Sequence, residues 1–127
     1  MEDFSLKGQI YIPEIYFDVE SNELNFSGES YPEHAIKVYE PVYRWIDEYL
    51  KTPHRNIKVN FRMSYFNTSS SKCLLEILKK LEAYVLAGKG KAKVYWFYEE
   101  GDIDMLEFGE FFENDVKLPF EFCVIEK

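Results

Sequence analysis

Segments with the period of a β-strand alternate along this chain with segments that have the period of an α-helix. Ile57 to Phe66, "IKVNFRMSYF", carries an apolar residue at every second position, which predicts a strand. Ser70 to Ala87 repeats apolar residues every three or four positions, which predicts a helix that ends before Gly88. A strand–helix–strand order favours parallel βαβ units with right-handed crossovers. This alternation therefore predicts an α/β fold built on a mostly parallel sheet.

The N-terminal residues predict a β-hairpin. Gln9 to Val19 is rich in β-branched and aromatic residues, and Pro13 makes it an edge strand or a strand that follows a bend. Ser21 to Gly28 supplies a turn and a second short strand, with Leu24 and Phe26 on one face.

The first helical region lies within Gly28 to Lys51, where the apolar residues keep a helical stripe. Pro32 suits the first turn of a helix, because the N–H that proline lacks would have no partner there. Pro41 interrupts the stripe, so we expect a kink or the start of a second helix at this position.

The C-terminal third continues the alternation of strands and helices. We expect a strand, a short acidic helix and a final strand, at residues 92–100, 101–115 and 118–126. The predicted order is β-β-α-β-α-β-α-β, in a single domain over residues 1–127 with a mostly parallel mixed sheet.

The composition and the net charge limit the classes of partner that we expect for the chain. Of its 127 residues, 46% are hydrophobic and 18% aromatic, which is typical of a folded domain. Lys and Arg total 15 against 23 Asp and Glu, a net charge of −8, so neither nucleic acid nor an anionic membrane is an expected partner. We expect no signal peptide, membrane span or cofactor, and two reduced thiols, Cys73 and Cys123. These features favour a cytoplasmic protein that binds other proteins.

Sequence signatures of catalysis are absent. The chain has no GxSxG, P-loop or GxGxxG motif, and its two histidines, His34 and His54, lie beside proline-marked breaks where surface positions are usual. A Ser-His-Asp site assembles in space rather than in sequence, but nothing in this sequence favours one. We therefore expect a protein that is not an enzyme.

An acidic segment, Glu99 to Glu110, offers one alternative. Its carboxylates could bind Mg²⁺ or Ca²⁺, which would suit a small metal-dependent hydrolase. The segment lacks a twelve-residue EF-hand loop, however, and Asp102 and Asp104 more simply cap and charge the start of a helix. We expect no metal site, and we favour a partner surface as the role of this segment.

Four consecutive hydroxyl residues, Thr68 to Ser71, separate the predicted strand from the predicted helix. One hydroxyl can serve as a helix N-cap, but four exceed that need, and no Glu or Gln completes a capping box. The run also follows the carboxyl end of a parallel strand, where a phosphate would meet free helix N–H groups, with Lys72 one turn in. A capping role and a phosphorylation switch both remain open, and this reasoning does not choose among the four hydroxyls.

The motif "YFNTSSSK", together with "GESYPEH", "YEPVYRWIDEYL" and "YWFYEEGDIDMLEFGEFF", resembles the SiaC family of bacterial phosphoproteins that regulate biofilm formation. The resemblance runs from about Tyr11 to Phe122, and "YFNTSSSK" and "DMLEFGE" are its specific blocks. It implies a STAS-like fold, similar to that of anti-sigma-factor antagonists, and a role in partner switching. A serine/threonine kinase would phosphorylate one threonine and a PP2C-type phosphatase would remove the phosphate. The unphosphorylated form would bind and activate a diguanylate cyclase and so raise cyclic di-GMP.

The resemblance assigns the phosphothreonine to the first hydroxyl after the asparagine, which is Thr68 here. The expected phosphosite loop comprises Asn67, Ser69, Ser70, Ser71 and Lys72, and the expected partner surface comprises Tyr65, Phe66, Glu99, Glu100, Asp102 and Asp104. We expect one of the serines to cap the helix and Lys72 to contact the phosphate. The chain departs from the family at His34, where asparagine usually follows "SYPE". A purely structural subunit is a further alternative, which burial of Thr68 would favour.

Overall fold

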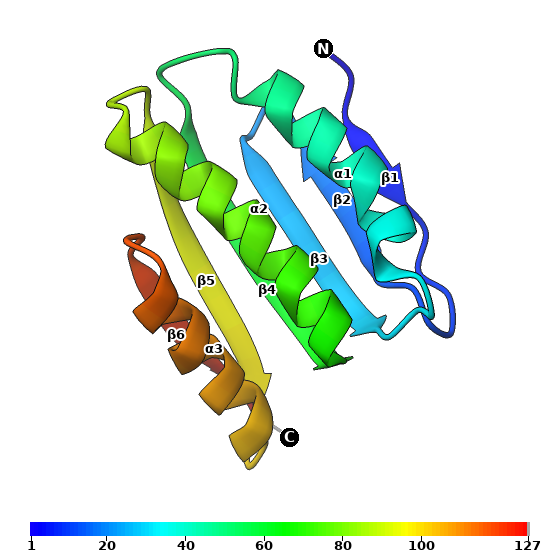
Figure 1. Ribbon diagram of the computed structural model, residues 1–127. Helices are drawn as coiled ribbons and strands as arrows, with labels where there is room; N and C mark the ends of the chain where they lie inside the picture. Colours follow the sequence, from blue (N-terminus) through cyan, green and yellow to red (C-terminus); the bar gives the residue numbers. More distant parts are fainter. Residues whose placement is uncertain (127) are drawn as a thin grey trace.

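The computed structural model describes residues 1–126, and all the strands among them belong to one sheet (Figure 1). The elements, in chain order, are β1 (Phe4–Leu6), β2 (Glu14–Asp18), β3 (Glu23–Ser30), α1 (Ala35–Tyr49), β4 (Asn56–Phe66), α2 (Thr68–Leu86), β5 (Lys91–Glu99), α3 (Ile103–Asp115) and β6 (Phe120–Ile125). The predicted α/β architecture is confirmed, and it agrees with the STAS-like fold that the resemblance implies.

Each strand of the sheet pairs with its neighbour in sequence, in the order β1-β2-β3-β4-β5-β6. β1, β2 and β3 pair antiparallel, which confirms the N-terminal hairpin, whereas β3 to β6 run parallel. Sequential parallel strands with right-handed crossovers place all their connecting helices on one face of the sheet. Figure 1 shows α1, α2 and α3 side by side on that face.

The core lies between the sheet and the three helices. The alternating residues of β4 point into it, and Ile57, Val59 and Phe61 are all buried, as their period of two predicts. Trp96 on β5 is fully buried and lies edge-on to Phe112 of α3, with ring centroids 5.4 Å apart. The aromatic residues that make the composition unusual therefore hold α3 against the sheet.

The N-terminal quarter differs from the prediction in two ways. β1 was not predicted, because its three residues are too few to show a period. Because β1 pairs with β2, β2 is not an edge strand. The other prediction, a strand that follows a bend, is confirmed, since β2 begins just after Pro13, where the chain bends.

The helix α1 begins later than predicted and is not divided. It starts at Ala35 rather than at Pro32, since Gly28 to Ser30 extend β3 instead. It continues through Pro41 to Tyr49 without a second start. Pro41 leaves the carbonyl of Lys37 without its helical N–H, but both residues are exposed, so water can satisfy that carbonyl.

All three helices begin at the same end of the molecule. In Figure 1 each helix starts at the lower end, where the arrowheads of the parallel strands lie, and runs upward. This arrangement follows from the βαβ crossovers, which return the chain antiparallel to the strands. The N-termini of α2 and α3 and the carboxyl ends of β4 and β5 therefore meet, which is where α/β sheets present functional groups.

A glycine sets the close approach of α3 to the sheet. A Cβ atom on Gly109 would lie 2.6 Å from two indole atoms of Trp96 and 2.7 Å from the ring of Phe122. The same indole donates a hydrogen bond from Nε1 to the carbonyl of Met105, at 2.9 Å. Gly109 thus allows the helix and the tryptophan to occupy adjacent space.

We expect Gly109→Ala to destabilise the protein. In an ordinary helix interior this change stabilises by about 1 kcal/mol, but here the new methyl group displaces Trp96, and overpacking of this kind costs about 1–3 kcal/mol. Urea unfolding monitored by tryptophan fluorescence measures the difference. Glu110→Ala, at the next and exposed position, is the control and should change stability by less than about 0.5 kcal/mol. A higher unfolding midpoint for Gly109→Ala would contradict the close packing.

Candidate functional site

The start of α2 is organised by Asn67, which is its N-cap. The Asn67 side chain accepts a hydrogen bond from the Ser70 N–H at 2.9 Å, and the backbone N–H of Asn67 donates to the carbonyl of Ser30 at 3.0 Å. The expectation that a serine caps this helix is therefore wrong. The helix also begins earlier than predicted, so the hydroxyl run occupies its first turn instead of a loop.

The structure separates the four hydroxyl residues by exposure. Thr68 and Ser69 are exposed, Ser71 is half-buried, and Ser70 is fully buried with 0% of its surface accessible. A helix repeats every 3.6 residues, so four consecutive side chains point in different directions around its axis. Exposure of Thr68 removes the observation that would have favoured a purely structural role.

A buried network of hydroxyls anchors this first turn. Ser30 at the end of β3 donates to the Ser70 hydroxyl at 2.8 Å and lies 2.8 Å from the Tyr39 hydroxyl of α1. All three residues are buried, and burial raises the pKa of Tyr39 well above its ordinary value. One serine therefore ties the start of α2 to both the sheet and α1.

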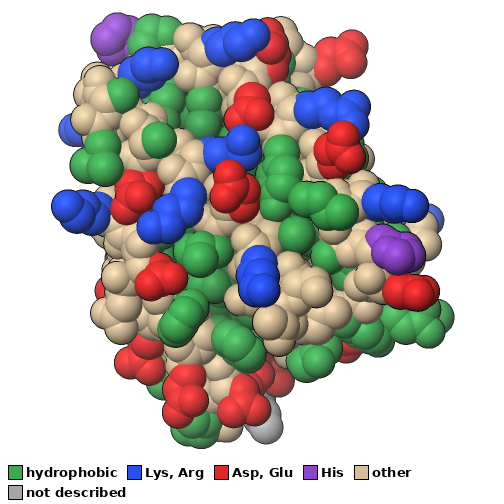
Figure 2. Space-filling model, in the orientation of Figure 1, with side chains coloured by type: hydrophobic (Ala, Val, Ile, Leu, Met, Phe, Trp, Pro, Cys, Tyr) green, Lys and Arg blue, Asp and Glu red, His purple; other side chains and the backbone are tan. Residues whose placement is uncertain are grey.

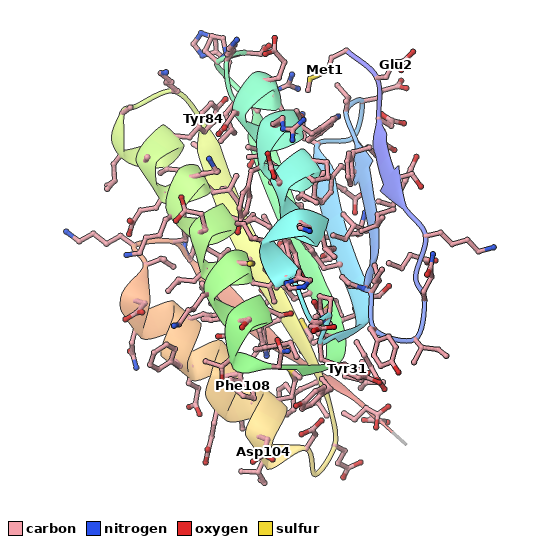
Figure 3. All side chains as sticks on the ribbon, turned by 45° about the vertical axis from the view of Figure 1, so that its right-hand side comes forward. Met1, Glu2, Tyr31, Tyr84, Asp104 and Phe108 are labelled. Atoms are coloured by element: carbon pink, nitrogen blue, oxygen red, sulfur yellow. The ribbon has the colours of Figure 1, made fainter. Side chains whose placement is uncertain are left out.

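A groove of about 730 Å³ opens between the start of α2 and the outer side of α3. Its lining residues are Ser64, Tyr65, Phe66, Asn67, Thr68 and Ser71 from β4 and α2, and Asp102, Asp104, Met105, Glu107, Phe108 and Phe111 from α3. Thr68 thus shares one groove with Asp102, Asp104 and Glu107 of the acidic segment. Figure 3 labels Asp104 and Phe108 at this lower end of the molecule, and Tyr84 at the other.

The groove joins an apolar wall to an acidic rim. Tyr65 and Phe111 are exposed aromatic side chains, with 50% and 56% of their surfaces accessible. Asp102 and Asp104 lie at the start of α3, where the helix dipole favours negative charge, and Asp102 caps the helix by accepting from the Met105 N–H at 3.1 Å. Figure 2 shows acidic (red) and hydrophobic (green) side chains gathered at the lower end of this face.

The other expected site residues lie outside the exposed part of the groove. Phe66 lines it but is only 2% exposed and packs with Trp96 and Phe112, so it belongs to the core and offers little to a partner. Glu99, the last residue of β5, and Glu100, on the turn before α3, are exposed and lie beyond the groove lining.

Two expected site residues lie at helix starts. Lys72 is exposed in the second turn of α2. His34 precedes α1 and makes no side-chain capping bond.

Sequence reasoning missed Phe111 as a site residue. Met105, Phe108 and Phe112 form the apolar stripe of α3, and Phe111 falls outside that stripe. A large aromatic residue off the buried face of an amphipathic helix is a signal of an exposed contact residue, and it was available in the sequence.

The metal-dependent alternative finds no support at the groove. Asp102 and Asp104 line it, but the part of the lining that the described residues form contains no histidine. Within residues 1–126, no group of three or more His, Cys, Asp or Glu side chains is placed to hold a metal ion.

A model of the SiaC family, described as regulatory phosphoproteins, matches residues 6–125 of this chain. The chain belongs to the SiaC family. The uncharacterized protein PA14_02130 of Pseudomonas aeruginosa (strain UCBPP-PA14) is 30% identical over 120 residues, which cover 94% of each chain. The family resemblance noted in the sequence is thereby confirmed, and membership in a family of regulatory phosphoproteins agrees with the expectation of a non-enzyme.

Solved structures of SiaC match the fold closely. SiaC of Pseudomonas aeruginosa superposes with a TM-score of 0.90 at 29% identity, over 98% of this chain and all of that one. The crystal structure of the diguanylate cyclase SiaD in complex with its activator SiaC, also from P. aeruginosa, contains a chain that matches with a TM-score of 0.90 at 28% identity, over 97% of this chain and 100% of that one. Within residues 1–126, no helix has the length and apolar character needed to cross a membrane.

We expect Ser70→Ala to destabilise the protein and Ser69→Ala to leave its stability unchanged. The first change leaves the buried Ser30 hydroxyl without its acceptor, which costs about 1–3 kcal/mol. The second removes an exposed hydroxyl from the same turn, an effect within about 0.5 kcal/mol. Thermal unfolding of the two variants measures the difference. Equal unfolding temperatures would contradict the assigned network.

Proposed function

We propose that the protein is a non-catalytic partner-switching regulator whose binding is controlled by phosphorylation of Thr68. In its unphosphorylated form it binds and activates a diguanylate cyclase, which raises cyclic di-GMP and so regulates biofilm formation. Two findings support this proposal: membership in the SiaC family, and the structural match to SiaC, the activator bound to SiaD. A serine/threonine kinase adds the phosphate and a PP2C-type phosphatase removes it. Because the kinase uses ATP, the proposed compartment is the cytoplasm.

The observation that carries the assignment of Thr68 is its position at the exposed edge of the groove. A kinase needs a hydroxyl that can enter its active site, which the fully buried Ser70 cannot do. Thr68 is the first residue of α2 and lines the groove together with the exposed Tyr65. Ser69 is also exposed but is not among the groove-lining residues, so a phosphate there would not enter the same surface.

The groove is the proposed docking site for the cyclase. Exposed aromatic residues set in a hollow are the usual anchors of a protein interface, because they bury a large area at small entropic cost. Phe111 and Tyr65 provide such side chains on the two sides of the groove. The acidic residues at the start of α3 would then select against acidic partners.

A phosphate on Thr68 would oppose docking in this groove. It adds about −1.5 to −2 charges and three oxygens that need partners. The open N–H groups at the start of α2 and the positive end of its dipole can hold it, with Lys72 nearby. An apolar segment entering the groove would have to strip water from this dianion, and that cost favours release.

The acceptor assignment is tested by phosphorylation in vitro. Wild type, Thr68→Ala and Ser69→Ala are incubated with the cognate kinase and ATP, and phosphorylated residues are mapped by mass spectrometry. We expect one phosphate on wild type and on Ser69→Ala, and none on Thr68→Ala, because Thr68 is the one residue of the run from Thr68 to Ser71 that is exposed and also lines the groove. Labelling of Thr68→Ala at the wild-type level would refute the assignment.

The switch itself is tested by cyclase binding. Phosphorylated wild type should bind the cyclase about 5- to 150-fold more weakly than the unphosphorylated protein, the range of a typical coupling between two sites. Thr68→Glu should weaken binding in the same direction, whereas Thr68→Ala should bind like unphosphorylated wild type. Equal binding by Thr68→Glu and Thr68→Ala would exclude electrostatic switching at this residue.

The docking groove is tested by Phe111→Ala, with Leu86→Ala as the matched control. Both residues are exposed and apolar, but Leu86 is the last residue of α2, at the opposite end of the molecule. We expect Phe111→Ala to lower the affinity for the cyclase by about ten-fold, as loss of an aromatic anchor does. Leu86→Ala should have no effect. Titration by isothermal calorimetry gives both values, and equal affinities would rule out the groove.

A further inference from the structure

The exposed apolar residues around the phosphosite extend beyond the groove. Ile10 and Tyr11, in the segment before β2, are 74% and 57% exposed. The Tyr31 N–H, just after β3, donates to the Tyr11 carbonyl at 3.0 Å, which fixes this segment at the same end of the sheet as Thr68. Figure 3 labels Tyr31 at this lower end, as it does Phe108 of the groove.

Three tyrosines connect the N-terminal segment to the groove. The rings of Tyr11 and Tyr31 lie 5.1 Å apart at 89°, and those of Tyr31 and Tyr65 lie 5.5 Å apart at 72°. Edge-to-face packing of this kind is favourable and holds the rings in place. We refer to Tyr11, Tyr31 and Tyr65 as the tyrosine ladder. Because its rings are already ordered, a partner that covers them loses little entropy in doing so.

A second hollow accompanies the ladder. It measures about 500 Å³ and is lined by residues of the N-terminal segment and the end of β3, including Ile10, Glu14, Glu29 and Tyr31. Ser64 lines both this hollow and the groove beside Thr68, so the two are adjacent. The sheet end therefore presents one continuous surface with two depressions.

The charge of this surface has one sign. Glu14 and Glu29 line the second hollow, and Asp102, Asp104 and Glu107 line the groove. Among the described residues 1–126, neither lining includes a lysine or an arginine. Partial desolvation and then the Glu29 carboxylate raise the pKa of Tyr31 above its ordinary value, which reflects the acidic surroundings of its hydroxyl.

We propose that the tyrosine ladder and its hollow form a second half of the docking surface for the diguanylate cyclase. The matching element of the cyclase carries apolar anchors flanked by Lys or Arg, which complement the five carboxylates. This inference rests on the proposed function and adds a contact that function does not require. Tyr11 and Tyr31, unlike Tyr65, do not line the groove that holds Thr68, so their contact persists when Thr68 is phosphorylated.

Separation of the two halves has a measurable consequence. Phosphorylation weakens the groove contact but leaves the ladder contact, so the phosphorylated protein retains weak binding. Removing Tyr11 should lower the affinity of both forms by the same factor, because Tyr11 does not line the groove and contacts at separate places contribute additively. The ladder would thus contribute equally to the affinity of both forms for the cyclase. The phosphate on Thr68 would set the ratio between the affinities of the unphosphorylated and phosphorylated forms.

The test measures cyclase affinity for wild type, Tyr11→Ala and Ile10→Ser, with Tyr16→Ala as the matched tyrosine control. Tyr16 is exposed on β2 and lies outside both hollows. The probes are the purified diguanylate cyclases of the source organism together with SiaD of P. aeruginosa. We expect a loss of about ten-fold for Tyr11→Ala and for Ile10→Ser and none for Tyr16→Ala. Phosphorylation of Thr68 by the kinase should stay at the wild-type rate in all four proteins, which also shows that they are folded.

Further measurements separate the ladder from the proposed function. Raising the salt from about 0.1 M to 1 M shortens the screening length from about 10 Å to 3 Å, and the affinity should fall if the partner segment is basic. Equal affinities for Tyr11→Ala and Tyr16→Ala would overturn the ladder while leaving the groove intact. An affinity that rises with salt would overturn the basic partner segment proposed for the whole surface. Binding of wild type to none of the cyclases would instead overturn the proposed function, and the ladder with it.

Discussion

The parallel pairing of β4 with both β3 and β5 is the constraint from which the rest of the structure follows. Because the parallel strands pair in chain order, each connecting helix returns on the same face of the sheet and begins at the same end. That end collects the first turns of α2 and α3, and with them the exposed Thr68 and the carboxylates Asp102 and Asp104. Residues more than thirty positions apart in the chain thus line one groove without any long loop.

Buried hydrogen bonds hold the start of α2 in place, and they limit how phosphorylation of Thr68 can change the structure. Ser30 ties Ser70 to the sheet and to Tyr39 of α1, while Asn67 supplies the cap. A buried hydroxyl that loses its partner costs about 1–3 kcal/mol, so melting this turn is unfavourable. A phosphate on Thr68 is therefore better accommodated on a rigid turn than by unfolding it, and its effect is confined to the surface that a partner covers.

The sequence predicted the strongly periodic elements and failed where tertiary contacts decide. β4 and α2 are long and regular, so their periods identified them within two residues. β1 is three residues long, and it is stabilised by tertiary contacts: its pairing with β2 and the packing of Phe4 against Phe17 and Trp45. In the site, the surplus of hydroxyls was visible in the sequence, but the burial of Ser70 depends on Ser30, forty positions away, which no local pattern contains. The exposed Phe111 was visible as a residue off the apolar stripe and was overlooked.

The existing negative charge of the protein decides whether a phosphate on Thr68 acts through long-range repulsion or through local contacts. The chain already carries a net charge of −8, and the linings of the groove and the second hollow are acidic. An added −1.5 to −2 changes the long-range field only modestly, and at physiological salt it is screened beyond about 8 Å. Distant repulsion is thus a weak means of control for this protein. The strong local terms are the space that three phosphate oxygens occupy beside Thr68 and the water that a docking apolar side chain must remove from them.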